Sequence, residues 1–262
     1  MLIIGIGAGN PDFVTIQAVN AMNQVDVFFI PDKGIEKDEL ARVRREILER
    51  HVRDRPFRTV EFKAPERKRT GEYEVDVSDW HDDVEAAYSK LIMEELDASE
   101  TGAFLVWGDP TLYDSTMRIL DRLKERGEFE LDYEVLPGIN SIQALAARHK
   151  VALCNIGRSI LISTGRTMAE GFPNKVDSVV IMLNAEKALR AVDGDLDIYW
   201  GAYVGMPDEV LVAGKFKEVI DEIERIREEA RYVIVRFFAM TTLKRPALRI
   251  MICDHENHHH DT

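Results

Sequence analysis

Short apolar runs alternate with amphipathic stretches along the first half of the chain. Five of these runs predict strands, at Leu2–Ile6, Val25–Ile30, Arg58–Phe62, Ala103–Trp107 and Tyr133–Leu136. Between the runs, apolar residues three and four positions apart predict helices around 16–25, 40–52, 84–96 and 117–126, with Gly127 as the C-cap of the last. Strands that alternate with helices predict a mostly parallel sheet covered by helices on both faces.

The second half of the chain has a different spacing of apolar runs. They predict strands at Ile160–Ser163, Val179–Leu183, Ile198–Tyr203, Tyr232–Phe238 and Leu248–Ile252, with helices at Ala185–Val192 and Lys215–Arg231. We therefore expect an α/β protein with two lobes, an N-terminal α/β lobe at 1–138 and a C-terminal α+β lobe with a mixed sheet at 139–262. The polar, His-rich segment 255–262 is predicted to be a disordered tail. No low-complexity linker separates the lobes, so we expect a ligand cleft between them.

Three glycine- or proline-rich loops follow predicted strands of the first lobe. They are Gly5–Pro11, Gly108–Pro110 and Pro137–Ser141. The carboxyl ends of parallel strands meet at one edge of a sheet, and ligands of open α/β sheets bind outside that edge. The sequence therefore predicts that these loops gather there and form the site.

The first loop admits more than one interpretation. Gly5 and Gly7 fit the dinucleotide fingerprint G-x-G-x-x-G, but Asn10 stands where its third glycine belongs. A nicotinamide-binding protein and a tight turn without ligand both stay open, whereas a P-loop is excluded because no Gly-Lys-Ser/Thr follows. Pro11 either starts a helix with Asn10 as its cap or delays the helix until Thr15.

The net charge and the two cysteines indicate which ligands and which cell compartment to expect. The net charge of -13 argues against nucleic-acid binding, which needs a basic face. Segment 36–69 has a net charge of +4, and it is either a solvated helix or a basic surface for an acidic small molecule. Cys154 and Cys253 are predicted to be buried free thiols of a reducing, cytoplasmic compartment. With no long apolar run and no signal peptide, we expect no membrane span.

Three motifs occur in a characteristic order: "GIGAGNPDFVT" (5–15), "VWGDPTLYDST" (106–116) and "PGINSIQALAA" (137–147). Together they resemble the tetrapyrrole methylases, a family of two-lobed methyltransferases. The resemblance implies S-adenosylmethionine as methyl donor, S-adenosylhomocysteine as product, a small-molecule tetrapyrrole substrate in the cleft between the lobes, and a homodimer. It also implies that Gly5, Gly7, Gly9 and Pro11 face the tetrapyrrole, with glycines that let the backbone approach a flat ligand.

The resemblance extends to further stretches of the chain. Residues 27–34, 40–51, 79–81, 102–120 and 235–240 are similar to the family members that methylate precorrin-5 at C-1 and release acetate in aerobic cobalamin biosynthesis. Another precorrin methyltransferase, a nicotinamide-dependent oxidoreductase and a non-catalytic binding module remain alternatives. Matching the family's motifs implies a cofactor pocket lined by Gly108, Asp109, Pro110, Tyr113, Asn140, Ser141, Met182, Leu183, Ala202, Pro246 and Ala247.

The chemistry itself suggests further candidates. Loss of an acetyl group needs a positioned base and hydrogen-bond donors, for which Asp12, His81, Tyr113 and Asp114 are candidates. The sequence does not choose among them, and His81 is equally well a surface residue at a helix start. Arginines bind carboxylates bidentately, so Arg42, Arg45 and Arg166 are predicted to hold the acidic side chains of the substrate. Methyl transfer needs no metal, and no spacing typical of metal ligands occurs.

Overall fold

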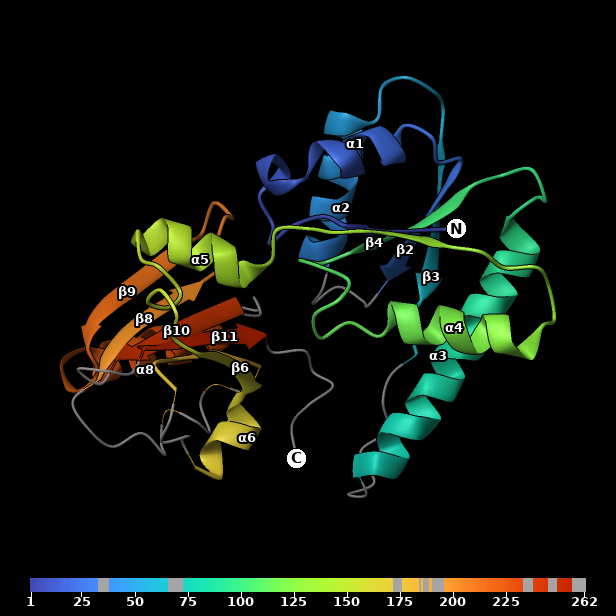
Figure 1. The fold of residues 1–262 in the computed structure, drawn as a ribbon. Coiled ribbons are helices and arrows are strands. Elements are labelled where there is room, and N and C mark those ends of the chain that lie inside the picture. Colours follow the sequence, from blue (N-terminus) through green and yellow to red (C-terminus); the bar gives the residue numbers. More distant parts are fainter. Residues whose placement is uncertain are drawn as a thin grey trace. The chain divides into compact units, whose positions relative to one another are not determined.

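The computed structural model describes residues 1–32, 38–65, 73–171, 176–183, 185, 189, 196–232, 238–244 and 249–255. Contacts divide the chain into two compact units, Met1–Asn140 and Ser141–Asp261, and each unit is described by itself below. Figure 1 shows both units with their elements labelled.

The first unit alternates strands and helices along the chain. Its elements are β1 (Leu2–Gly5), η1 (Pro11–Phe13), α1 (Ile16–Met22), β2 (Val27–Asp32), α2 (Asp38–His51), β3 (Arg58–Lys63), α3 (Tyr73–Glu95), β4 (Gly102–Val106), α4 (Thr116–Arg126) and β5 (Glu134–Leu136). Each of the five predicted strands is confirmed, with bounds that shift by one or two residues.

All pairings in the first sheet are parallel, in the order β3-β2-β4-β1-β5. Residues 27–30 of β2 and the whole of β4 are buried, as expected of central strands covered on both faces. Edge strand β3 is half exposed and alternates polar with apolar residues. The α/β class predicted from the alternating pattern is confirmed.

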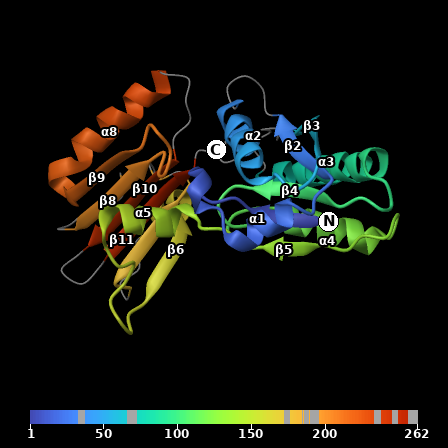
Figure 2. The same ribbon diagram turned by 90° about the horizontal axis from the view of Figure 1, so that it is seen from above.

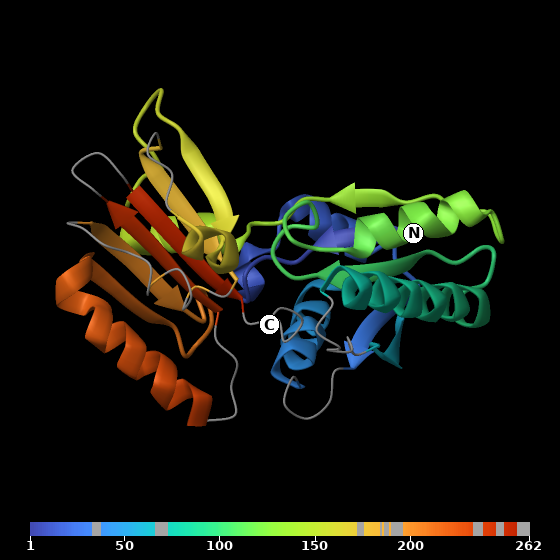
Figure 3. The ribbon, with the colours of Figure 1, turned by 90° about the horizontal axis from the view of Figure 1, so that it is seen from below.

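Helices cover both faces of this sheet (Figures 1 and 3). Helices α3 and α4 pack against Ile3, Val27 and Phe104, in a core that also contains Leu91 and Leu120. Helices α1 and α2 contact each other and strands β1 and β2 on the other side. This arrangement leaves the carboxyl ends of the strands as the edge at which the connecting loops meet.

Local capping explains where the helices begin and end. Both possibilities left open for the first loop occur: Asn10 caps the short turn η1, and Thr15 then caps α1 by accepting a hydrogen bond from Ala18 N at 3.1 Å. Gly127 ends α4 with φ +65°, and its N–H donates to the carbonyl of Leu123.

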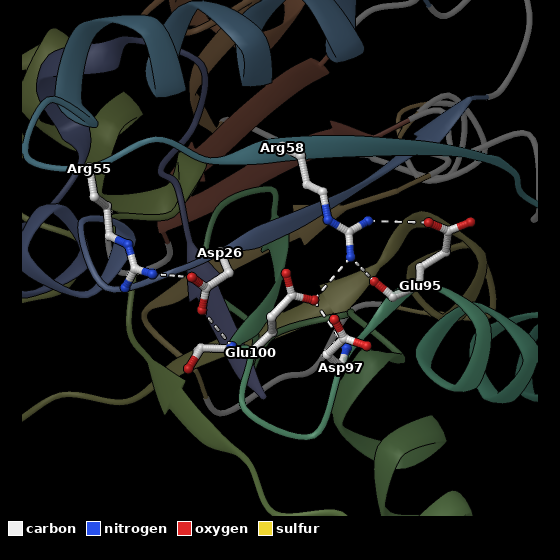
Figure 4. Close-up of polar contacts among 7 residues, drawn as sticks. Asp26, Arg55, Arg58, Glu95, Asp97 and Glu100 are labelled. Atoms are coloured by element: carbon white, nitrogen blue, oxygen red, sulfur yellow. Dashed lines mark hydrogen bonds and ion pairs between the residues drawn. The ribbon is translucent and has the colours of Figure 1, made fainter.

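The opposite, amino-terminal edge of the first sheet is held by side-chain charges, shown in Figure 4. Arg58, the first residue of β3, bonds to Glu95 at 3.2 Å and to Glu100 at 3.0 Å. Arg55 pairs with Asp26, and Asp26 also accepts a hydrogen bond from the N–H of Thr101 at 2.8 Å. We call Asp26, Arg55, Arg58, Glu95 and Glu100 the arginine network.

The second unit contains more strands and fewer long helices. Its described elements are α5 (Ser141–His149), β6 (Ile160–Thr164), α6 (Gly165–Ala169), β7 (Ser178–Met182), β8 (Asp197–Ala202), β9 (Val210–Lys215), α8 (Phe216–Tyr232), β10 (Phe238–Lys244) and β11 (Arg249–His255). Figure 2 shows α5 across the strands of this sheet. The predicted helix at 185–192 lies almost entirely outside the described residues.

The second sheet is mixed, as predicted. Strands β6, β7 and β11 run parallel to one another, and β11 is also parallel to β8. Strand β10 is antiparallel to β7, β8 and β11, and β9 is antiparallel to β8. The carboxyl ends of β6, β7 and β8 therefore point to the same edge of this sheet.

Three expectations for the second unit are wrong. Strand β9 at Val210–Lys215 was not predicted, because its short apolar run directly precedes the helix that was. The strand predicted at Tyr232–Phe238 is wrong at Tyr232, which ends α8; residues 233–237 lie outside the described part, and Phe238 is the first described residue of β10. Strand β11 includes His255, which was assigned to the tail, and residues 256–262 lie outside the described part.

The described residues also bear on the thiols and on membrane insertion. Cys154 is a free thiol, but it is only partly buried, so the predicted burial is wrong for this residue. In the described part of the chain, no helix has the length and apolar character needed to cross a bilayer.

Candidate functional site

Three loops meet at the carboxyl edge of the first sheet. They follow β4, β1 and β5, which are neighbouring strands. Gly7 and Gly108 form a bridge in which Gly108 N donates to Gly7 O at 2.8 Å and Gly7 N donates to Gly108 O at 3.2 Å. We call the segments Gly5–Pro11, Gly108–Pro110 and Pro137–Asn140 the loop junction. The prediction that these loops gather at one edge is confirmed.

The glycines of the loop junction pack against each other. A Cβ atom on Gly138 would lie 2.0 Å from the carbonyl oxygen of Gly108, and one on Gly5 would lie 2.6 Å from Gly138 N. Gly7 has φ +80°, and a Cβ there would lie 2.8 Å from Cβ of Phe13. Contacts inside the protein therefore require glycine at positions 5, 7 and 138, which is a reason additional to the ligand approach that the family resemblance implies.

The Asp109 carboxylate joins two of the three loops. Its Oδ2 accepts a hydrogen bond from Gly138 N at 2.9 Å, and its Oδ1 accepts one from Thr111 N at 2.9 Å and another from the Thr111 hydroxyl. These bonds occupy both carboxylate oxygens. Asp109 therefore joins the segment after β4 to the loop after β5.

Apolar side chains are exposed around this edge. Tyr113 is 45% exposed in the segment after β4, Ile139 is 38% exposed after β5, and Ile16 is 81% exposed at the start of α1. Asn140 lies against the same loops, with its Cβ 3.5 Å from the Cβ position of Gly108. Gly108 and Pro110 are buried beneath the junction. Backbone polar groups beside exposed apolar side chains suit a flat ligand with polar substituents.

Tyr113 has an unusual backbone conformation, with φ +54°. A bulky residue in this region is strained by about 1–2 kcal/mol, and such residues cluster at functional sites. Partial burial raises the pKa of its phenol, so the hydroxyl stays protonated at neutral pH and can donate a hydrogen bond.

The two carboxylates proposed as bases have other partners. Asp12 forms an ion pair with Arg50 of α2. Asp114 Oδ1 accepts a hydrogen bond from Thr116 N at 2.8 Å at the start of α4. Both lie in loops at the carboxyl edge, so their position suits a role in the site, whereas these contacts lower their availability as bases.

His81 lies inside α3, nine residues into the helix, and not at a helix start. Its ring contacts Trp80, with centroids 5.1 Å apart. Burial, together with the positive charges of Arg122 and Arg118, lowers its pKa. The imidazole is therefore neutral at neutral pH and can accept a proton, on an element separate from the loop junction.

The arginines of α2 differ in their surroundings. Arg42 is exposed and lies 4.0 Å from Glu46, and Arg45 forms a 2.7 Å ion pair with Glu61 of β3. Arg44, which the sequence analysis did not single out, is buried, with only 9% of its surface exposed. Helical spacing was the available signal, because Arg44 lies on the same face as the buried Ala41, Ile47 and Leu48.

The remaining predicted residues belong to the second unit, at the carboxyl edge of its sheet. Met182 ends β7 and Ala202 ends β8, both with buried side chains, while Arg166 lies exposed on α6 after β6. Leu183 is buried with φ +63°, and its carbonyl accepts a hydrogen bond from Gly165 N at 2.8 Å. Ser141 is buried at the start of α5. Pro246 and Ala247 lie outside the described residues.

Among the residues that the structure describes, no group of three or more His, Cys, Asp or Glu side chains could hold a metal ion.

Comparison with known proteins matches this arrangement to one family. The family model described as Tetrapyrrole (Corrin/Porphyrin) Methylases matches residues 1–220. The chain belongs to this family. Among curated relatives, this methylase is 50% identical to precorrin-6A synthase [deacetylating] of Sinorhizobium sp over 233 residues, which cover 88% of this chain and 89% of the relative.

Solved structures agree with the assignment of the methylase fold. The cobalamin synthesis related protein CobF from Corynebacterium diphtheriae matches with a TM-score of 0.78 and 30% identity, over 94% of this chain and 98% of that chain. Uroporphyrin-III C-methyl transferase from Thermus thermophilus, complexed with S-adenyl homocysteine, matches with a TM-score of 0.51 and 17% identity, over 84% and 85% of the two chains. This second likeness concerns the fold alone.

Proposed function

We propose that this methylase uses S-adenosylmethionine to methylate precorrin-5 at C-1, with water releasing the acetyl group as acetate, so that precorrin-6A and S-adenosylhomocysteine are formed. The single observation that carries the proposal is the 50% identity to precorrin-6A synthase [deacetylating] over 88% of the chain. The loop junction adds physical support, because the family's motifs meet at the one sheet edge where α/β proteins bind ligands.

The fit of the methyl donor rests on the loop junction. The exposed side chains of Tyr113 and Ile139 lie beside the main chain of the loop junction, so apolar and polar groups stand together at one edge. Bound there, S-adenosylmethionine would supply a methyl group on a positively charged sulfur. The protein then has to align the acceptor carbon and exclude water, and such positioning contributes about 7–11 kcal/mol in favourable cases.

The second part of the proposed site comes from the second unit. On the family resemblance, we propose that the backbone at Met182 and Leu183 and the end of β8 at Ala202 also bind the donor. The outlying φ values support it: +63° at Leu183 and +52° at Tyr203, directly after β7 and β8. Pro246 and Ala247 remain part of the proposed pocket on the family resemblance alone.

The tetrapyrrole is the proposed occupant of the space over Gly9 and Pro11. Its carboxylates need positive partners in an acidic protein, and Arg42, Arg45 and Arg166 are the proposed ones. For loss of acetate we propose Tyr113 as a hydrogen-bond donor to the developing oxyanion. Asp12, His81 and Asp114 are the proposed bases, among which substitution has to choose. A homodimer in the cytoplasm is part of the same proposal and rests on the family resemblance.

The decisive experiment incubates the purified protein with precorrin-5 and S-adenosylmethionine that carries a labelled methyl group. We expect one labelled methyl per macrocycle, one S-adenosylhomocysteine and one acetate. Methyl transfer without acetate would identify a sibling methyltransferase that acts at another carbon.

Calorimetry provides the matched test against the other classes. Binding of S-adenosylhomocysteine without binding of NAD is the expected result. Binding of NAD alone would identify an oxidoreductase, and tetrapyrrole binding without turnover would identify a binding module.

A further inference from the structure

Arg44 is buried beside the segment that leads into the loop junction. Its Nε donates to the carbonyl of Leu105 at 3.0 Å, and its Nη1 donates to the carbonyl of Leu40 at 3.1 Å. Leu105 is the fourth residue of β4 and is followed within three residues by Gly108. A buried guanidinium is costly unless it is well bonded, so its place here needs an explanation.

The sheet itself shows why Leu105 needs this donor. Val27 N donates to Thr101 O at 3.2 Å, and parallel pairing repeats at every second residue, so the N–H that would reach Leu105 O belongs to position 31. That residue is Pro31, which has no N–H. The β2–β4 pairing ends at Phe29 and Phe104, and Arg44 supplies the donor that the strand lacks.

The same guanidinium is coupled to groups on the far side of β4. Burial lowers the pKa of Arg44 to about 10, and the negative charge of Asp114 opposes this shift, so Arg44 stays protonated at neutral pH. Asp114 starts α4 through its bond to Thr116 N. Tyr88 of α3, whose ring stacks on Phe104 with centroids 4.3 Å apart, also shares an electrostatic interaction with Arg44. These charge interactions accompany the two hydrogen bonds of Arg44, which join α2 to β4.

Arg44 lies between two strands whose connections leave to opposite faces of the sheet. The connection after β2 leads to α2 on one face, and the connection after β4 leads to α4 on the other face. Adjacent strands whose connections leave to opposite faces create a crevice at the carboxyl edge. Between β2 and β4, the protein's own guanidinium occupies the place where the strand hydrogen bonds stop.

We propose that Arg44 is a positioning residue for the methyl donor: by bonding the carbonyl of Leu105, it fixes the start of the segment 106–114 that contains Gly108, Asp109 and Tyr113. This inference rests on the proposed function, because it assumes that this segment binds the donor. In this proposal Arg44 acts through Leu105 and does not itself contact the donor. The strained conformation of Tyr113 persists only if its segment is held. Arg44 holds the start of that segment through Leu105, and the hydrogen bond from Thr116 N to Asp114 holds its end.

The test compares Arg44→Met and Arg44→Lys with a matched control, Glu85→Gln. Glu85 is also a buried charge of the first unit, paired with Arg122 at 2.7 Å and with Arg126 at 2.5 Å, between α3 and α4. Binding of S-adenosylhomocysteine is measured by calorimetry below the melting temperature of every variant. Amide hydrogen exchange of segment 106–116 is measured without ligand.

We expect Arg44→Met to weaken S-adenosylhomocysteine binding by about tenfold or more and to accelerate exchange in 106–116. Arg44→Lys keeps the charge but cannot make the same fixed pair of bonds, so it should lose about threefold. Glu85→Gln should lower the melting temperature while leaving affinity within about twofold of wild type.

Two results would overturn the inference: wild-type affinity in Arg44→Met, or an equal loss of affinity in Glu85→Gln. Failure of the wild-type protein to bind S-adenosylhomocysteine would instead refute the proposed function. In that case the exchange measurement still tests the inference, because unchanged hydrogen exchange of segment 106–116 in Arg44→Met would show that Arg44 does not fix this segment. Failure of the inference and failure of the proposed function are therefore distinguishable.

Discussion

The two edges of the first sheet are held in opposite ways. At the carboxyl edge, the loop junction is joined by main-chain bonds between Gly7 and Gly108 and by Asp109, with little side-chain volume between the loops. At the amino-terminal edge, the arginine network joins strand starts and helix ends through long charged side chains (Figure 4).

In the proposed function, the carboxyl edge binds the ligands and the amino-terminal edge supports the sheet. Exposed ion pairs contribute little stability each, about 0–1 kcal/mol, and tolerate substitution. Main-chain contacts at van der Waals limits tolerate almost none, since any added atom moves a whole loop. The loop junction therefore fixes its geometry without using the side chains that point outward, and these stay available for ligands.

The largest effect is expected from Gly138→Ala. The new Cβ would lie 2.0 Å from the Gly108 carbonyl oxygen, so the two loops must separate. We expect a loss of about 3 kcal/mol or more in unfolding free energy, measured by urea denaturation, and loss of S-adenosylhomocysteine binding.

Gly127→Ala is the control, because Gly127 has positive φ but open space around it. It should lose about 1 kcal/mol and keep its affinity. Equal loss of binding in both would contradict the close-contact argument.

A smaller effect is expected from Asp109→Ala. Removing the carboxylate leaves the N–H groups of Gly138 and Thr111 without their acceptor, which costs about 1–3 kcal/mol and loosens two loops. Affinity for S-adenosylhomocysteine should fall with stability. Glu100→Gln is the matched change at the opposite edge, where Glu100 accepts a bond from Asp97 N. If Glu100→Gln weakened binding as much, the two edges would not differ in the way argued above.

Arg58→Met should have a small effect on stability and none on affinity. Its guanidinium is exposed, and Glu100 and Glu95 raise its pKa by hydrogen bonding, so the charged form is favoured but screened by solvent. We expect a slight decrease in melting temperature that shrinks in high salt. Lys90→Met, at a single exposed pair 3.9 Å from Glu94, should change less. A loss of binding in Arg58→Met would assign a functional role to the supporting edge.

The smallest effect is expected from His81→Gln, and only in acid. A pKa lowered in the folded state means that the unfolded chain binds the proton more readily. The stability that the neutral imidazole supplies is present above about pH 6.5 and is lost as the pH falls below that value. Denaturation at pH 7.5 and pH 5.5 should therefore show a smaller acid loss in His81→Gln than in wild type.

Acetate release by His81→Gln tests whether α3 or the loop junction supplies the base. Acetate release at the wild-type rate would remove His81 from the candidate bases and keep the chemistry at the loop junction. Loss of acetate release in a stable His81→Gln protein would extend the active centre to α3.

Local patterns were enough to predict the strands of the first unit, whereas α3 begins at Tyr73, eleven residues before the helix expected around 84–96. Each strand there is a compact apolar run, and the connecting helices show clear spacing, so the parallel sheet and its loop edge followed from the sequence. Strand β9 did not, because Val210–Lys215 becomes a strand by pairing with β8 and then runs directly into α8. The run at 232–238 is apolar enough for a strand, yet Tyr232 completes the helix before it.

The sequence predicted the sheet edge at which the loops of the candidate site meet, but not the contacts that hold these loops together. The sequence shows that Gly5 and Gly138 are glycines, but not that they meet, since they are separated by more than 130 residues. Similarly, helical spacing places Arg44 on the apolar face of α2, but the sequence does not show what its guanidinium bonds. The bond to Leu105 is possible because the β2–β4 pairing ends before Pro31, which only the folded sheet displays.

The main-chain construction of the loop junction has a consequence for how such a protein can change. Tyr113 and Ile139 project from a frame whose integrity does not depend on their identity. Either can therefore be exchanged singly to alter ligand preference while the scaffold persists. A library randomised at these two positions should contain many folded proteins with new selectivity, whereas the same diversity at the neighbouring glycines should yield almost none.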